Sequence, residues 1–192
     1  MRVVGALLAV VLAHGQVSGQ VNPDRRINIS GYSTGSYCHV LDAPGLVTIY
    51  IVYEGLELSS ISFTARVPQC AGLIYLGDET PFPATTGDSQ MGVTVSLGEC
   101  RGTFMHLLTV QYAGSGYTPP CCLYPITAGP GSSGVGGVDC AGHAVAVAPI
   151  CGYINGTPSC DCTILGPIYE VCDVTPTTPT TWGQIKAAYM NN

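Results

Sequence analysis

The residues whose types and spacing come nearest to a catalytic motif are Gly31-Tyr32-Ser33-Thr34-Gly35. This is the G-x-S-x-G pattern of the nucleophile elbow, in which a serine lies on a sharp turn between a strand and a helix. The segment from Tyr37 to Pro44 runs into proline and glycine, so it predicts no helix. Asp88 or Asp139 with His106 or His143 could be imagined as partners, but nothing in the sequence ties them together. We therefore expect a turn after a first strand and no enzyme, with a serine hydrolase using Ser33 as a distant alternative.

Ten cysteines form the second group with possible chemistry. They are Cys38, Cys70, Cys100, Cys121, Cys122, Cys140, Cys151, Cys160, Cys162 and Cys172. An even number in an exported chain is typical of disulfides, so all ten are disulfide candidates, although the sequence leaves their connectivity open. Adjacent Cys121 and Cys122 are expected to bond to different partners. The alternative is a metal site built from Cys160-Asp161-Cys162 with Cys151 and Cys172, but zinc sites usually have a wider Cys-x2-Cys spacing.

The remaining polar candidates are scattered. Asp78, Glu79 and Asp88 could contribute to a calcium site, but they do not form a spaced acidic loop. His39, His106 and His143 are isolated, and Asn28 and Asn155 begin possible glycosylation motifs. The 11 tyrosines could supply a platform for stacking sugars or could equally be core residues. We predict no metal and no cofactor.

Composition and charge narrow the class of partner. Lysine and arginine total 6 against 12 acidic residues, which gives a formal net charge of -6 and argues against a nucleic-acid partner. Hydrophobic residues make up 46% of the chain and charged residues 9%, a composition that is not typical of disorder.

The beginning of the chain predicts export. Arg2 precedes an apolar run from Val3 to Ala13 that is too short to span a bilayer, and Val17-Ser18-Gly19 fits a cleavage site. We assign residues 1–19 to a signal peptide and expect the mature chain outside the cytoplasm, secreted, extracellular or in the cell envelope. After cleavage we expect no membrane-spanning segment.

The elements that would position these residues are strands. Leu46–Tyr53 is almost wholly β-branched or aromatic, Glu54-Gly55 predicts a turn, and the segment from Ser59 to Val67 alternates apolar and polar residues. Strand-like segments recur every ten to fifteen residues up to about residue 174, which predicts a disulfide-stapled, all-β antiparallel β-sandwich over residues 20–174. The predicted core includes Val47, Ile49, Ile51, Ile61, Phe63, Val93, Val95, Leu107 and Val147.

The C-terminal end predicts a separate element. Residues 175–180 are Thr and Pro only and predict an extended linker. Thr181 and Gln184 fit a capping box, so we predict a short amphipathic helix within residues 181–192. Trp182, Ile185 and Tyr189 follow at helical spacing and form an apolar stripe. We expect this stripe to serve attachment or recognition.

The order of these features resembles that of a loose group of small exported β-sandwich proteins of environmental bacteria. The resemblance rests on Ile27-Asn-Ile-Ser with Cys38 downstream, on Leu46–Tyr53 and Leu58–Pro68, on Gly98-Glu99-Cys100, and on the tail Thr181-Trp-Gly-Gln-Ile-Lys186. Their sandwich is similar to cohesin-like and immunoglobulin-like modules. The resemblance implies an extracellular structural or protein-interaction module. A carbohydrate-binding module is the alternative, so the expected partner is an extracellular protein or a polysaccharide.

Overall fold

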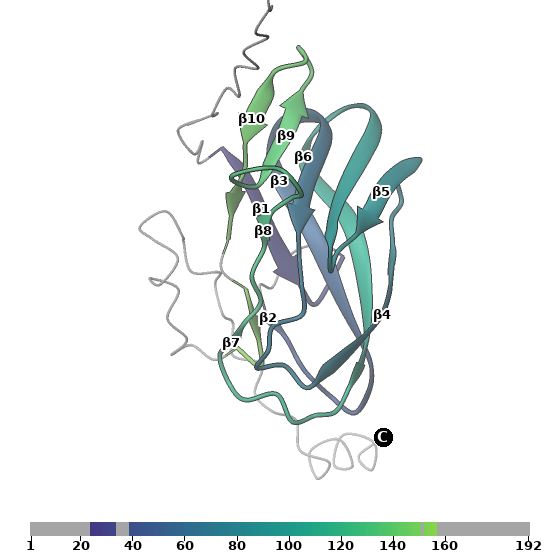
Figure 1. Ribbon diagram of the computed structural model, residues 1–192, viewed down its shortest axis with the longest axis vertical. Coiled ribbons are helices and arrows are strands. Elements are labelled where there is room, and N and C mark those ends of the chain that lie inside the picture. The colour runs from purple at the N-terminus through teal and green to yellow at the C-terminus, as the bar shows by residue number, and fades with distance from the viewer. Residues whose placement is uncertain (1–23, 34–38, 151, 157–192) are drawn as a thin grey trace, which may run out of the picture.

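The computed structural model describes residues 24–33, 39–150 and 152–156, and these residues form strands joined by turns and loops (Figure 1). The strands are β1 (Arg25–Ser30), β2 (His39–Val40), β3 (Gly45–Thr64), β4 (Leu73–Glu79), β5 (Ala84–Asp88), β6 (Gly92–Gly114), β7 (Cys122–Leu123), β8 (Thr127–Ala128), β9 (Gly136–Asp139), β10 (Ala144–Ala146), β11 (Ala148–Pro149) and β12 (Tyr153–Ile154). The predicted signal peptide, linker and tail helix lie outside the described residues.

A long ribbon made of β3 and β6 is the centre of the fold. The two strands pair antiparallel from Gly45 opposite Gly114 to Phe63 opposite Val93. The sequence predicted two strands and a turn at Glu54-Gly55, which is wrong, because β3 continues through this point and bends. Gly55 allows the bend, since its φ is +144° and a Cβ there would lie 2.1 Å from the backbone oxygen of Asp24.

Two layers share this ribbon. Along the first half of β3, β1 pairs with β3, β11 pairs with β1, and β4 pairs with the second half of β6. Along the other half of the ribbon, β8 and β9 pair with β3, β10 pairs with β9, and β5 pairs with β6. The bend brings the two halves face to face, so the architecture is a β-sandwich in which both layers contain β3 and β6.

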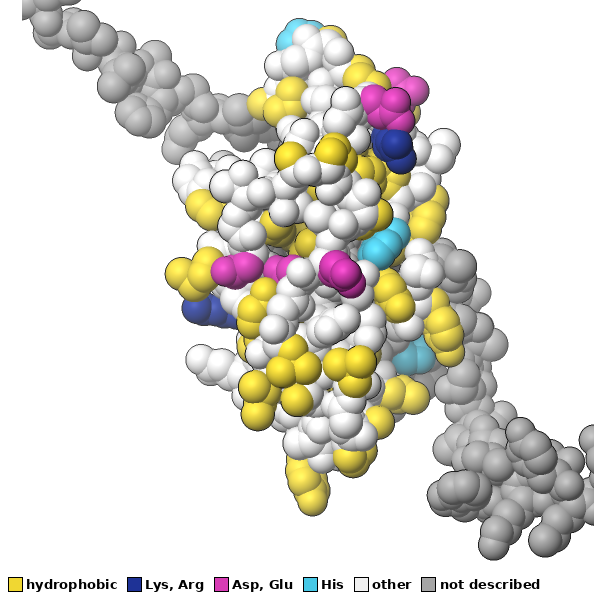
Figure 2. Space-filling model, turned by 90° about the vertical axis from the view of Figure 1, so that its right-hand side faces the viewer, with side chains coloured by type: hydrophobic (Ala, Val, Ile, Leu, Met, Phe, Trp, Pro, Cys, Tyr) yellow, Lys and Arg dark blue, Asp and Glu magenta, His cyan; other side chains and the backbone are white. Residues whose placement is uncertain are grey.

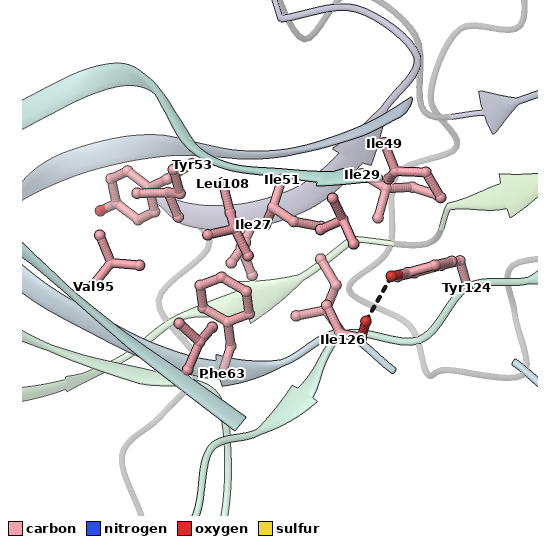
Figure 3. Close-up of a cluster of buried hydrophobic side chains, with 14 of the residues drawn as sticks. Ile27, Ile29, Ile49, Ile51, Tyr53, Phe63, Val95, Leu108, Tyr124 and Ile126 are labelled. Atoms are coloured by element: carbon pink, nitrogen blue, oxygen red, sulfur yellow. Dashed lines mark hydrogen bonds between the residues drawn. The ribbon is translucent and has the colours of Figure 1, made fainter. Parts of the chain in front are cut away.

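Both layers contribute one face to a single hydrophobic core. In Figure 3, Phe63 and Val95 from one half of the ribbon lie across the core from Ile27, Ile51 and Leu108 of the other layer. The strands alternate apolar and polar residues because successive side chains point to opposite faces of a sheet. The prediction for the core is confirmed, since all nine side chains are buried.

The prediction of a purely antiparallel sandwich is wrong in two places. β11 pairs with β1 in parallel, with Arg26 opposite Ala148, and β12 pairs in parallel with β2 in a small second sheet that also contains β7. Alternation within one strand cannot reveal the direction of a partner that lies far along the chain. The described residues contain no helix, and none of them forms a segment that could cross a membrane as a helix.

Candidate interaction surface

Gly31, Tyr32 and Ser33 of the serine motif follow β1, and Thr34 and Gly35 lie outside the described residues. Ser33 lies exposed after β1. The His106 ring packs edge-on against Tyr50, and its Nε2 lies 2.9 Å from the Thr109 hydroxyl oxygen. Burial lowers the pKa of His106. His143 is engaged in a turn with Asp139, 3.4 Å from Nδ1 to Oδ2. These histidines therefore have structural contacts of their own.

Two disulfides are resolved among the described cysteines. Cys70 bonds to Cys122, and Cys100 bonds to Cys140. Cys121 is also disulfide-bonded, but not to its neighbour Cys122. This agrees with the prediction that these two cysteines bond to different partners. The other five candidates, Cys38, Cys151, Cys160, Cys162 and Cys172, lie outside the described residues, and with them the alternative metal site.

The acidic residues proposed for calcium hold a turn instead. The Asp78 carboxylate accepts hydrogen bonds from the Ser89 backbone N–H and from the Ser89 hydroxyl, the latter at 2.8 Å. Asp88 Oδ1 accepts from the backbone N–H groups of Gln90 and Met91 at 2.9 and 2.8 Å. Within residues 24–33, 39–150 and 152–156, no three His, Cys, Asp or Glu side chains gather as metal ligands would.

A buried pair of tyrosines connects the turn between β5 and β6 to the core. The hydroxyl oxygens of Tyr112 and Tyr124 lie 2.5 Å apart, and Tyr124 donates to the backbone oxygen of Ala65 at 2.6 Å. Gln90 Nε2 donates to the Tyr112 hydroxyl at 3.1 Å. Burial raises the pKa of Tyr112 to about 12 and raises that of Tyr124 well above its usual value, so both phenols stay protonated at neutral pH. The pair therefore ties the turn between β5 and β6 to the core.

One end of the sandwich presents large apolar side chains to solvent. Leu46 on β3 lies opposite Ala113 on β6, and Ala113 lies opposite Ile74 on β4, so the three form one row across three strands. Leu46, Ile74 and Leu76 are 67%, 69% and 57% exposed. Figure 2 looks onto the side of β4 and β5 and shows hydrophobic side chains gathered below a row of acidic ones. We call Leu46, Ile74, Leu76 and the exposed loop residues Leu41 and Tyr117 the apolar end.

The strand at this surface has an open edge. In the described part of the fold β4 pairs only with β6, so its other edge has no strand beside it. A β-bulge follows Tyr75, and the pairing resumes with Gly77 opposite Gln111. A Cβ added at Gly77 would meet no atom within 4 Å. An unpaired edge beside exposed apolar side chains is the arrangement that accepts an added peptide strand.

A buried carboxylate fixes the loops beneath the apolar end. Asp42 is 9% exposed, and its oxygens accept from the backbone N–H of Gly116 at 3.1 Å and from the N–H and hydroxyl of Thr118 at 3.0 and 2.7 Å. Desolvation alone would raise the pKa of Asp42, but these hydrogen bonds outweigh it and lower the pKa. The Asn155 side chain joins the same network, because its Oδ1 accepts from the Asp42 N–H at 2.9 Å and its Nδ2 donates to the Thr118 oxygen at 2.6 Å. The loops that carry Leu41 and Tyr117 are therefore held firmly.

The opposite end of the sandwich, where the ribbon bends, carries more charged side chains. We call this region the bend end and define it by Gly55, Thr103 and the Cys100–Cys140 disulfide. Its exposed side chains include Glu54, Glu57, Glu99 and Arg101, together with Leu56 and Phe104. Arg101 pairs with Glu99 at 2.6 Å.

The sequence did not reveal the apolar end. Leu46–Tyr53 is largely apolar on both faces, which predicts a strand covered on both sides, but Leu46 is exposed. Whether Leu46 and Ile74 meet on an uncovered face depends on which strands pair, and a pattern within one strand does not contain that information. The available signal was the run Leu73-Ile74-Tyr75-Leu76, which is apolar at every position although only alternate positions of an edge strand face the core.

Comparisons with known proteins identify no family for this chain. No protein family and no curated protein matches the sequence. One solved structure of similar shape is the sixth cohesin of scaffoldin B from Acetivibrio cellulolyticus, crystallised in complex with a Cel5 dockerin mutant. The likeness covers 70% of this chain and 98% of that chain, with 12% identity and a TM-score of 0.45.

Proposed function

We propose that this chain is a non-enzymatic, extracellular protein-interaction module that binds an apolar segment of a partner protein at the apolar end, along the open edge of β4. The observation that carries the proposal is the row of Leu46 and Ile74, both about two-thirds exposed, on a sheet face that no described element covers. Contiguous exposed apolar side chains on a soluble protein mark interaction sites more often than scattered single ones do.

The arrangement fits a polypeptide better than a sugar. Sugar-binding surfaces use exposed aromatic rings in a row, and the large exposed aromatic residues in the described chain are Tyr32, Phe104 and Tyr117. Tyr32 follows β1, Phe104 lies at the bend end, and Tyr117 follows β6, so they do not share a row. A peptide strand beside β4 would instead satisfy the edge N–H and C=O groups, and its alternate side chains would cover Ile74 and Leu76.

The disulfides support an extracellular location. Cys70–Cys122 and Cys100–Cys140 persist in an oxidising environment such as the periplasm or the cell exterior. The partner is accordingly proposed to be an extracellular or envelope protein.

The test is a selection of peptides from a random display library on the full chain. Peptides with alternating apolar residues should bind the wild-type protein, and Ile74→Glu should reduce their affinity by about tenfold or more, as expected when a charge is buried at an apolar contact. Met91→Glu is the matched control, because Met91 is 70% exposed but belongs to the turn between β5 and β6.

Hydrogen exchange locates the bound peptide. The N–H groups on the open edge of β4 should exchange more slowly in the complex, while those of β5 should not change. If the selected peptides bind Ile74→Glu and wild type equally, or if oligosaccharides rather than peptides protect β4, the proposal is wrong.

A further inference from the structure

The described chain ends beside the apolar end. Asn155 Nδ2 donates to the Thr118 backbone oxygen at 2.6 Å, and the Thr118 hydroxyl accepts from the Gly72 N–H at 2.8 Å. Gly72 immediately precedes β4, which carries Ile74 and Leu76. Two hydrogen bonds therefore connect the last described residues to the start of the strand with the open edge. Residues 157–192 continue from this point.

The sequence that continues contains an apolar stripe. Trp182, Ile185 and Tyr189 lie at helical spacing, and Trp182 is the only tryptophan in the protein. A helix of about ten residues is marginal in water unless its apolar face is covered. Within residues 175–192 the only charged side chain is Lys186, whereas β4 ends in the exposed acidic residue Glu79.

We propose that the C-terminal stripe of the same molecule occupies the apolar end and that a partner must displace it to bind. This proposal rests on the proposed function for the identity of the surface. The 24 residues 157–180 separate Gly156 from Thr181, and a chain of that length can span at most about 80 Å. Because the stripe belongs to the same chain, its contact with the apolar end is intramolecular, so even a weak contact is populated.

The arrangement regulates the interaction surface. While the stripe covers Leu46 and Ile74, the apolar end is shielded from unspecific contacts. A partner that competes for the same surface binds with an apparent affinity that is reduced by the fraction of covered molecules. Apolar ligands that bind the surface only weakly are therefore excluded by the stripe.

Fluorescence of Trp182 in the full chain tests the contact. In the wild type, acrylamide should quench Trp182 less than it does in the urea-unfolded chain. Ile74→Glu should abolish this protection and shift the emission to longer wavelength, and Leu46→Ser is a milder variant at the same row. Met91→Glu is the control and should leave the emission unchanged. Near-ultraviolet circular dichroism from the tyrosines verifies that each variant is folded.

Several outcomes would overturn the proposal. Trp182 could be as accessible in the wild type as in the unfolded chain, or it could be protected regardless of Ile74 and Leu46. Protection that is lost on dilution would assign the stripe to a second copy of the chain instead of the same molecule.

A second measurement separates this proposal from the proposed function. Trp182→Ala should increase the affinity of the library-selected peptides severalfold, because the competing segment is weakened. If the peptides bind but Trp182→Ala does not change their affinity, the self-covering contact is wrong and the interaction surface stands. If no peptide binds either protein while Ile74→Glu still exposes Trp182, the proposed function fails and the contact stands.

Discussion

The apolar end and the bend end lie at opposite ends of one sandwich, and they present different surfaces to solvent. At the bend end, Gly55 turns the ribbon over the core, and Glu54, Glu57, Glu99 and Arg101 are exposed. At the apolar end the ribbon is regular, and Leu46 and Ile74 face outward. The Cys100–Cys140 disulfide lies at the bend end, and Cys70, which is bonded to Cys122, lies three residues before β4. The two ends therefore offer different contacts to a partner, mainly charged side chains at the bend end and exposed aliphatic ones at the apolar end.

The largest expected effects come from the two disulfides. The Cys70–Cys122 bond spans 52 residues and the Cys100–Cys140 bond spans 40, and the entropy of loop closure predicts that each contributes about 4 kcal/mol. Replacing Cys70 and Cys122, or Cys100 and Cys140, by serine should lower the free energy of unfolding by similar amounts in urea titrations. A loss at one end only would show that the two ends are not fixed equally.

Replacing Gly55 or Gly77 by alanine compares the effect of an added Cβ at the two ends. Gly55→Ala should destabilise the protein by about 3 kcal/mol, because the new Cβ would meet the Asp24 backbone oxygen and φ is positive. Gly77→Ala is the control, since open space surrounds that position, and it should change stability by no more than about 0.5 kcal/mol. Thermal unfolding of both variants measures the contrast, and equal losses would contradict the bend assigned to Gly55.

Asp42 and Asp139 are two carboxylates whose contributions to stability can be compared. Asp42→Ala should cost about 2 kcal/mol, because the N–H groups of Gly116 and Thr118 lose their acceptor in a buried site. Asp139 also accepts two backbone hydrogen bonds, from Ala141 and His143, but in an exposed turn. Asp139→Ala should therefore cost clearly less. Urea titration of the two variants side by side decides this, and an equal cost would mean that water replaces the lost acceptor at both sites.

The same carboxylate predicts a dependence of stability on pH. The pKa of Asp42 is lower in the folded protein than in the unfolded chain, so its contribution is fully present above the unfolded pKa of about 3.9 and is lost as the pH falls through the folded pKa. The difference in unfolding free energy between wild type and Asp42→Asn should shrink as the pH falls from about 6 to about 2. A difference that stays constant with pH would show that Asp42 acts through packing alone.

The sequence predicts the inside of this fold better than its surface. Alternation identified the core residues, because a side chain such as Phe63 or Val95 is buried in any sandwich that uses its strand. It did not identify the bend at Gly55, where a turn and a bent continuous strand share the same residues. It also could not place Ile74 beside Leu46, since that contact requires β6 to lie between β4 and β3. The signal peptide, the linker and the stripe Trp182, Ile185 and Tyr189 stay predictions.

The parallel pairing of β1 with β11 sets the order in which the chain can fold. Arg26 lies opposite Ala148, and His39 of β2 lies opposite Tyr153 of β12. Each pair joins the two ends of the described sequence, so each closes a loop that contains almost the whole fold. Contacts of such high sequence separation are formed late and slow the folding of small domains to milliseconds or seconds. We therefore expect the β3–β6 ribbon to form first. Until β11 pairs with β1, we expect a partly folded state that exposes apolar core residues and is prone to aggregation.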